Sequence, residues 1–269
     1  MNNELKTNDV PNKLLLILTY FFSMYILAIV IGTITFFTLR TLYPNNPNNK
    51  TLMLTLTNLL VYAIMSFIFI FILKNYYSNQ FQAFKKKFAF FLAIAIASWI
   101  CSLFLNVVIE QIMELLNFKS RASQNQEAII ESFKYPLLAI PMIIFGAPIV
   151  EETIFRGVIF NFARNLKLPY KINIILAFIL SSTLFGLIHV FSAYLSTGDS
   201  SELLLGISYA AAGFVLTLVY YLTNNIFVPM LMHFIQNSFS VIIILLYPLL
   251  QTEPPTKIVY ILAQLIHII

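Results

Sequence analysis

Three charged residues, Glu151, Glu152 and Arg156, stand together within a long apolar part of the sequence. A charge at the centre of a bilayer costs about 2.5–3.5 kcal/mol on insertion scales, so this cluster needs a structural or chemical reason. Positions four apart share one face of a helix, which predicts an ion pair between Glu152 and Arg156. Glu151 faces elsewhere and has no cation in its own helix, so its carboxylate is available as a proton acceptor. The alternative is a buried charge cluster that only locks helices together.

Two histidines and one amide in other uncharged stretches add to the candidates. His189 ends the segment Phe185-Gly-Leu-Ile-His189, and His233 precedes Asn237 by four positions. His233 and Asn237 therefore project from one face of a helix, and both can donate hydrogen bonds to one oxygen, as an oxyanion site requires. Each of these side chains also has a simpler interpretation as a polar contact between membrane helices.

These residues come from three different apolar stretches, and a helix bundle can bring them to one hydrated cavity. In that arrangement Glu151 and His189 would bind and deprotonate a water molecule. His233 and Asn237 would stabilise the tetrahedral intermediate of peptide hydrolysis. The sequence has no nucleophile elbow around a serine, and its one cysteine, Cys101, has no adjacent base. The predicted chemistry is attack by activated water without an acyl-enzyme.

The elements that must position these side chains are transmembrane helices. The 269 residues are 59% hydrophobic and only 10% charged, far below the roughly 25% charged residues of a soluble domain. Long continuous runs without a charge, up to residues 203–252, predict spanning helices and exclude the alternating pattern of a membrane barrel. The net charge of +5 comes from basic residues that flank these runs, so a nucleic-acid partner is not indicated. The single cysteine excludes an internal disulfide.

The uncharged runs predict seven spans, followed by an apolar segment, 258–269, that is short for an eighth. The predicted spans are 14–39, 51–73, 88–115, 135–165, 172–195, 203–222 and 226–247. A polar loop is expected after the second span and a short amphipathic interfacial helix around Ala128, Ile129, Ile130 and Phe133. Nine Lys and Arg residues lie in the loops on the side of the N-terminus and six in the loops on the other side, which favours a cytoplasmic N-terminus.

Two features of the predicted helices bear on the site. Pro141 and Pro148 lie inside the span that carries Glu151 and should bend it or break its hydrogen-bond ladder. His189 is late in its span and His233 is early in a span of the same direction. This offset amounts to roughly 15 Å of depth at 1.5 Å per residue, which tilt or a different helix start must remove if the two share a site.

The three motifs together resemble those of the CAAX protease and bacteriocin-processing (CPBP, or Abi) family, which includes the Ras-converting CAAX endopeptidase. Glu151-Glu152-x-x-x-Arg156, Phe185-x-x-x-His189 and His233-x-x-x-Asn237 occur in the family's order on successive spans. The resemblance implies an intramembrane endopeptidase of about eight helices with its active site inside the bundle.

The resemblance also implies roles for individual residues. Glu151 and His189 would activate water, His233 and Asn237 would form the oxyanion site, and Glu152, Arg156 and Phe185 would support them. It divides the chain into residues 1–134, with three spans and the interfacial segment, and a catalytic membrane core at residues 135–269. The family mechanism implies no cofactor, although Glu151, His189 and His233 would be an acceptable zinc ligand set.

The expected partners are the lipid bilayer and a membrane-associated peptide or protein substrate, in what is expected to be a bacterial plasma membrane. Two other classes of function remain open from the residues alone. A proton-coupled transporter could use Glu151 and His189 as relay groups. A non-catalytic immunity or regulatory protein would need none of these side chains for chemistry.

Overall fold

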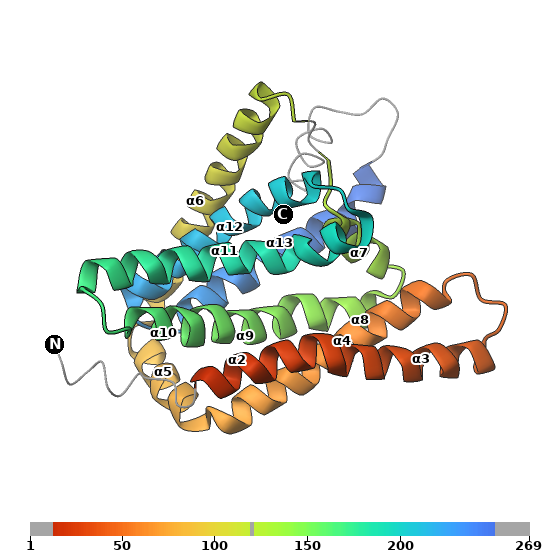
Figure 1. Ribbon diagram of the computed structural model, residues 1–269, viewed down its shortest axis with the longest axis horizontal. Helices are drawn as coiled ribbons and strands as arrows, with labels where there is room; N and C mark the ends of the chain where they lie inside the picture. The colour runs from red at the N-terminus through yellow and green to blue at the C-terminus, as the bar shows by residue number, and fades with distance from the viewer. Residues whose placement is uncertain (1–12, 119–120, 251–269) are drawn as a thin grey trace.

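The computed structural model describes residues 13–118 and 121–250, which form helices joined by short connections, with no β-strand among them (Figure 1). Within these residues seven helical stretches are long and apolar enough to cross a membrane. They are Lys13–Leu42, Asn49–Ile72, Phe88–Leu115, Pro136–Arg164, Tyr170–Thr197, Ser201–Thr223 and Phe227–Leu246. The predicted polytopic helical bundle is confirmed. The proposed eighth segment, 258–269, lies outside the described residues.

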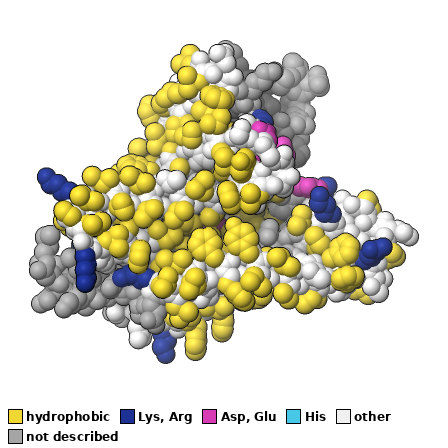
Figure 2. Space-filling view, viewed as in Figure 1, with side chains coloured by type: hydrophobic (Ala, Val, Ile, Leu, Met, Phe, Trp, Pro, Cys, Tyr) yellow, Lys and Arg dark blue, Asp and Glu magenta, His cyan; other side chains and the backbone are white. Residues whose placement is uncertain are grey.

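The first span is α2 (Lys13–Phe22) and α3 (Ala28–Leu42), joined by a π-helical turn. The other spans outside the Glu151 region are α4 (Asn49–Ile72), α6 (Phe88–Leu115), α11 (Tyr170–Thr197), α12 (Ser201–Thr223) and α13 (Phe227–Leu250). Figure 2 shows hydrophobic side chains across the middle of the molecule, with Lys and Arg gathered toward its two ends. This distribution suits a protein whose sides face lipid and whose ends face water.

The segment after α4 was predicted to be a polar loop, and this prediction is wrong: it forms the helix α5 (Lys74–Lys86). Tyr76, Gln80 and Phe84 recur every fourth residue and are buried on one face, while the remaining positions are exposed except for the half-buried Tyr77. Gln80 Oε1 also accepts a hydrogen bond from the backbone N–H of Ile226 at 3.0 Å. The helix is therefore held by its buried face and by the turn between α12 and α13.

The short helix predicted around Ala128, Ile129, Ile130 and Phe133 is present as α7 (Gln124–Ser132), and its place at the membrane interface stays a prediction. It begins with a capping box, in which Ser123 accepts from the backbone N–H of Gln126 and the Gln126 side chain accepts from that of Ser123. Ile129 and Phe133 pack against a small buried cluster at the start of the fourth span. The cap and this apolar face fix α7 against the bundle.

The fourth span is a continuous helix whose hydrogen-bond register changes several times. It consists of α8 (Pro136–Pro141), a π segment (Met142–Gly146), α9 (Ala147–Glu152), a second π segment (Thr153–Phe160) and α10 (Asn161–Arg164). The first π segment starts directly after Pro141 and ends two residues before Pro148. The predicted disturbance of the ladder is therefore present, as a widening of the helix rather than a break.

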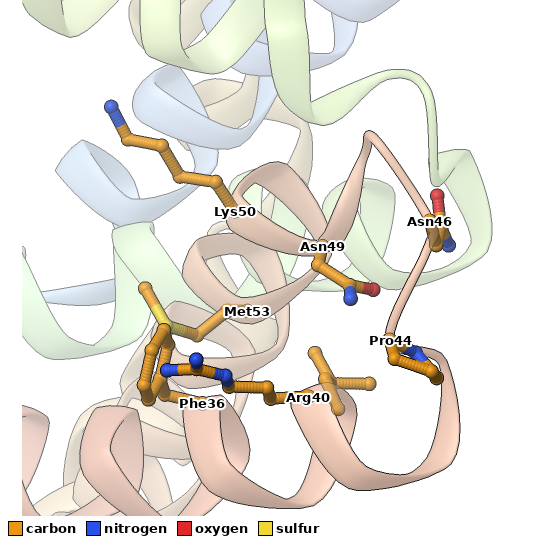
Figure 3. Close-up of a pocket in the computed structure, with 8 residues that line it drawn as sticks. Phe36, Arg40, Pro44, Asn46, Asn49, Lys50 and Met53 are labelled. Carbon is orange, nitrogen blue, oxygen red and sulfur yellow. The ribbon is translucent and has the colours of Figure 1, made fainter.

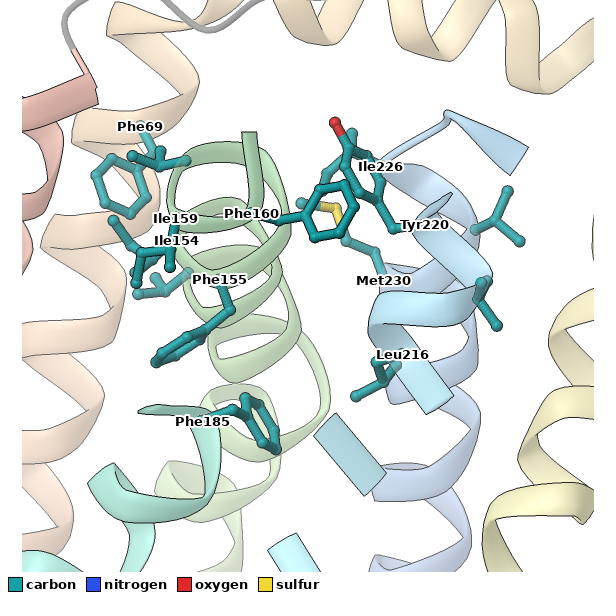
Figure 4. Close-up of a cluster of buried hydrophobic side chains, with 14 of the residues drawn as sticks. Phe69, Ile154, Phe155, Ile159, Phe160, Phe185, Leu216, Tyr220, Ile226 and Met230 are labelled. Atoms are coloured by element: carbon teal, nitrogen blue, oxygen red, sulfur yellow. The ribbon is translucent and has the colours of Figure 1, made fainter. Parts of the chain in front are cut away.

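The second π segment lies at the centre of the bundle, with every one of its side chains buried. Phe155 meets Phe185 edge to face at 5.4 Å between ring centroids, and Phe160 meets Tyr220 in the same way at 5.7 Å (Figure 4). Such edge-to-face pairs stabilise cores beyond the area they bury. These contacts fix the fourth span against α11 and α12, which is what positions the charged residues just before it.

Helices α11 and α12 approach each other closely through two glycines. A Cβ atom at Gly186 would lie 2.6 Å from the carbonyl oxygen of Gly206 and 2.9 Å from the backbone nitrogen of Ala210. Small residues at such a crossing let backbones pack directly in a membrane, where packing rather than the hydrophobic effect holds helices together. His189 lies one turn after Gly186, so this crossing also sets its position.

We predict that Gly186→Ala lowers the thermal stability of the detergent-solubilised protein, by an amount equivalent to about 1–3 kcal/mol. The added methyl group meets backbone atoms of α12, which cannot move aside without separating the helices. The matched control is Gly32→Ala in α3, where the new Cβ would lie 3.8 Å from Thr57 in ordinary contact. Melting followed by circular dichroism should show a loss for Gly186→Ala only. Equal melting temperatures for both variants would contradict the crossing.

Candidate active site

The ion pair predicted between Glu152 and Arg156 is present and fully buried. Arg156 Nη1 lies 2.9 Å from Glu152 Oε1, and neither side chain is exposed. Arg156 Nη2 donates to the carbonyl oxygen of Gly213 at 2.9 Å, and its guanidinium carbon lies 4.5 Å from the centroid of the Phe185 ring. A buried charge pair is tolerated only when other groups satisfy its remaining polar atoms. Here a carbonyl group and an aromatic face provide part of that support, while Glu152 Oε2 and Arg156 Nε have no hydrogen-bond partner among the described residues.

Glu151 points away from this pair, as helical spacing predicts, and is also buried. Its Oε1 accepts a hydrogen bond from the hydroxyl of Tyr62 in α4 at 2.8 Å. Its Oε2 lies 3.8 Å from His189 Nε2, beyond hydrogen-bond distance, and accepts no hydrogen bond from the described residues. The carboxylate is therefore held at one oxygen and free at the other, on the side that faces His189.

The hydrogen bond at the other nitrogen of His189 defines what the ring presents to Glu151. Nδ1 lies 2.7 Å from the carbonyl oxygen of Phe185, one turn back in α11. Because a carbonyl oxygen only accepts hydrogen bonds, Nδ1 carries the proton, and the neutral ring presents the lone pair of Nε2 to Glu151. Two acceptors thus face each other across 3.8 Å, an arrangement that suits a donor placed between them.

His233, in α13, contacts the other glutamate. Its Nδ1 lies 2.8 Å from Glu152 Oε1, the same oxygen that Arg156 contacts. Phe185 lies between the two histidines, with its ring centroid 4.8 Å from that of His189 and 6.0 Å from that of His233. Glu152 orients His233 through this contact, much as a carboxylate orients the histidine in hydrolytic triads.

Asn237 is tied to the widened part of the fourth span. Its Nδ2 donates to the carbonyl oxygen of Ile143 at 2.7 Å. In this π segment the backbone N–H of Ala147 donates to the carbonyl oxygen of Met142, five residues earlier. In the same register, the carbonyl oxygen of Ile143 would accept from the N–H of residue 148. Pro148 has no N–H, and the Asn237 amide takes its place. One N–H of Asn237 is used in this way, and its second N–H is not.

The depth offset predicted between His189 and His233 is absent at the level of the site. His189 lies well past the middle of α11 and His233 lies in the second turn of α13. They nevertheless contact the adjacent residues Glu151 and Glu152, and both contact Phe185. Helix α11 starts at Tyr170, no deeper than predicted, so the helices reach a common level by their relative offset and tilt. The structure therefore joins six of the seven motif residues in one network, whereas Asn237, one turn after His233, contacts the carbonyl oxygen of Ile143.

Tyr62 is a residue of this site that the sequence did not indicate. It lies in α4, in a part of the chain without a recognisable motif, and it reaches Glu151 because Gly146 leaves space for it. A Cβ atom at Gly146 would lie 3.1 Å from the Cβ of Tyr62. A tyrosine in an apolar run and a glycine two residues before a proline are the signals in the sequence, and neither identifies the other as its partner.

The described side chains do not fit a metal site. Within residues 13–118 and 121–250 no group of three or more His, Cys, Asp and Glu side chains is placed to hold an ion. The alternative ligand set of Glu151, His189 and His233 is divided, since His233 Nδ1 contacts Glu152 rather than Glu151. We therefore derive no chemical step through a metal.

A separate cavity of about 470 Å³ lies at the end of α3 and the start of α4 (Figure 3). It is lined by Phe36, Leu39, Arg40, Pro44, Asn46, Asn49, Lys50 and Met53. None of these residues belongs to the three motifs, so the cavity is not part of the candidate active site.

Fold and site together define a membrane-embedded helical protein with a buried pair of glutamates and two histidines at its centre. Residues 133–239, which include all three motifs, match the model of a protein family. This family is described as type II CAAX prenyl endopeptidase Rce1-like. This region of the chain is therefore similar to that family, the CPBP family that its motifs resemble.

Several proteins are similar to this chain. YdiL of Bacillus subtilis, assigned as a membrane peptidase, is 35% identical over 149 residues, which are 55% of this chain and 54% of YdiL. The membrane-embedded CAAX protease MroQ of Staphylococcus aureus is 34% identical over 123 residues, 46% of this chain and 45% of MroQ. An uncharacterised protein of Mycoplasma capricolum is 28% identical over 214 residues, which are 74% of this chain and 59% of that protein. The matches span about half the length of these relatives. No solved structure matches the chain.

We predict that Arg156→Gln destabilises the protein by about 3–5 kcal/mol, because it leaves the Glu152 carboxylate buried without its cation. The matched control is Lys134→Gln, which removes the cation of the exposed pair with Glu131. Loss of an exposed pair changes stability by about 0–1 kcal/mol. Denaturation in mild detergent should separate the two variants clearly. Similar stabilities would show that the buried pair does not hold the helices together.

Proposed function

We propose that this protein is an intramembrane endopeptidase that hydrolyses a peptide bond of a membrane-associated peptide or protein with activated water. The observation that carries the proposal is the pair of acceptors from separate helices, Glu151 Oε2 and His189 Nε2, 3.8 Å apart. A buried acceptor such as Glu151 Oε2 requires a donor. A water molecule that donates one hydrogen to each acceptor would meet this need and would be positioned for attack.

The first step uses Glu151 as general base. As the water oxygen bonds to the carbonyl carbon of the substrate, one of its protons passes to Glu151 and the carbonyl oxygen becomes an oxyanion. His189 keeps the water aligned through its Nε2 lone pair, while Tyr62 holds the other oxygen of Glu151. Because Tyr62 occupies Oε1, the proton is accepted at Oε2, the oxygen beside the water.

The oxyanion is assigned to His233 and Asn237. The second N–H of Asn237 can donate to it, since the first is used by Ile143. His233 contacts Glu152 through Nδ1, which leaves Nε2 to donate to the oxyanion when that nitrogen also carries a proton. Protonated Glu151 then gives its proton to the amide nitrogen, the C–N bond breaks, and a carboxylic acid and an amine are released.

The location of the site restricts its substrate. Glu151, Glu152 and His233 are buried among spans that cross the bilayer, so the scissile bond must reach the site from within or beside the membrane. The family name and that of MroQ support a protein or peptide tail as the substrate class. We assign the protein to a bacterial plasma membrane with a cytoplasmic N-terminus, on the basis of its bacterial relatives and its loop charges.

We predict that Glu151→Gln abolishes cleavage while the protein still folds, since glutamine cannot accept the proton. Removal of a general base lowers the rate by about 10²–10⁴-fold. Tyr62→Phe should reduce the rate less, because the base is retained and only its orientation is lost. Release of peptides from a quenched fluorogenic library by purified protein in detergent measures both effects, with mass spectrometry to locate the cleaved bonds.

Glu114→Gln, an exposed carboxylate in α6, is the matched control and should cleave as the wild type does. Full activity of Glu151→Gln would eliminate this mechanism. Function that persists in cells with Glu151, His189 and His233 all replaced would favour a non-catalytic partner. Transport by the purified protein in liposomes, together with absence of any cleavage, would favour a carrier instead.

We also predict that exhaustive chelation leaves cleavage unchanged, because the described residues offer no set of three metal ligands. The assay is the same peptide library after dialysis against a strong zinc chelator, with a zinc metalloprotease treated in parallel as the positive control. Loss of cleavage that zinc restores would contradict the assignment of Glu151 and His189 as the groups that activate water alone.

A further inference from the structure

Tyr209 in α12 stacks on the ring of His189. The ring centroids are 4.6 Å apart and the planes differ by 15°. The close crossing at Gly186 and Gly206 explains the contact, because each ring lies one turn along its helix from its glycine. Tyr209 belongs to none of the three motifs, and it covers the face of an imidazole whose Nε2 points at Glu151.

The hydroxyl of Tyr209 is fixed from outside the helix pair. It lies 2.8 Å from the Ser123 hydroxyl and accepts a hydrogen bond from Asn125 Nδ2 at 3.3 Å. Ser123 is itself the N-cap of α7. The ring that stacks on His189 is therefore anchored to the first residues of α7 and its N-cap.

The connection between α6 and α7 is in turn clamped to the start of α12 by Arg121. The guanidinium contacts Asp199 and Glu202 at 2.8 Å each and donates to the Ser201 hydroxyl at 2.7 Å. The Glu202 side chain is fully buried, while those of Arg121 and Asp199 are partly exposed. Hydrogen bonds from the Ser201 backbone N–H and hydroxyl, with smaller help from Arg121, hold the pKa of Asp199 below its usual value. The contact between Arg121 and Asp199 therefore persists at neutral pH and weakens only as the pH falls through the lowered pKa of Asp199.

We propose that Tyr209 is a positioning residue that couples the surface connection at residues 121–125 to the catalytic geometry of His189. The Phe185 carbonyl fixes only one atom of the imidazole, which leaves rotation about that hydrogen bond. Stacking on Tyr209 fixes the ring plane, and the Ser123 and Asn125 contacts fix Tyr209. The catalytic meaning rests on the proposed function, but the coupling itself does not.

The test reads His189 directly by nuclear magnetic resonance. The chain has only three histidines, so the ring signals of isotope-labelled histidine are few, and His189→Gln identifies the relevant one. In detergent micelles, Tyr209→Leu should remove the ring-current shift of the His189 ring protons. Ser123→Ala should move the same signals through the hydroxyl of Tyr209. In a Tyr209→Phe background, Ser123→Ala should have no further effect, since its partner atom is gone.

Tyr25→Leu, an exposed tyrosine in the first span, is the matched control and should leave the His189 signals unchanged. Unchanged His189 signals in Tyr209→Leu would overturn the stacking role. Equal effects of Ser123→Ala with and without the Tyr209 hydroxyl would overturn the coupling. If Tyr209→Leu does not fold, the Ser123→Ala and Tyr209→Phe cycle decides alone.

Cleavage assays add a separate arm: Tyr209→Leu should lower kcat by about 10–100-fold with KM little changed. Absence of cleavage by the wild type would reject the proposed function and leave the resonance result standing.

Discussion

The architecture depends on one buried interaction, the ion pair between Glu152 and Arg156. Two charges removed from water cost several kcal/mol each unless their geometry and their other hydrogen bonds offset the loss. The compensation comes from three other helices: the carbonyl of Gly213 in α12, the ring of Phe185 in α11 and the imidazole of His233 in α13. The need to satisfy this pair thus holds α11, α12 and α13 around the fourth span. The site is assembled by the same contacts that stabilise the bundle.

The two adjacent glutamates have different surroundings because successive side chains of a helix point in different directions. Glu152 is enclosed by a guanidinium and an imidazole at one oxygen. Glu151, turned about 100° around the helix, meets a tyrosine hydroxyl and the lone pair of a histidine. One residue along the helix therefore separates the ion-paired carboxylate from the one that we propose as the general base.

Much of this arrangement follows from local spacing. The ion pair, the divergence of Glu151 and the shared face of His233 and Asn237 all depend on helical periodicity, and the seven spans depend on apolar run length. The helix α5 was missed because its buried positions, Tyr76, Gln80 and Phe84, include polar side chains that hydropathy counts as exposed. Tyr62 and Tyr209 could not be found, because their roles depend on helix crossings set by Gly146, Gly186 and Gly206 far along the chain. The partner of Asn237 likewise depends on a ladder register that the sequence does not specify.

The widened turn at Met142–Gly146 gives this part of the fourth span a tolerance for a change of length. A π turn contains one residue more than an α-helical turn would need. Deleting one residue there would therefore restore the narrower ladder and leave Glu151 and Glu152 facing their present partners. A deletion in a regular α-helical turn before Glu151 would instead rotate everything downstream by about 100°, carrying Glu151 away from Tyr62 and Glu152 away from His233. Over evolutionary time, the widened turn should therefore accept the loss of one residue that the regular turns of the span reject.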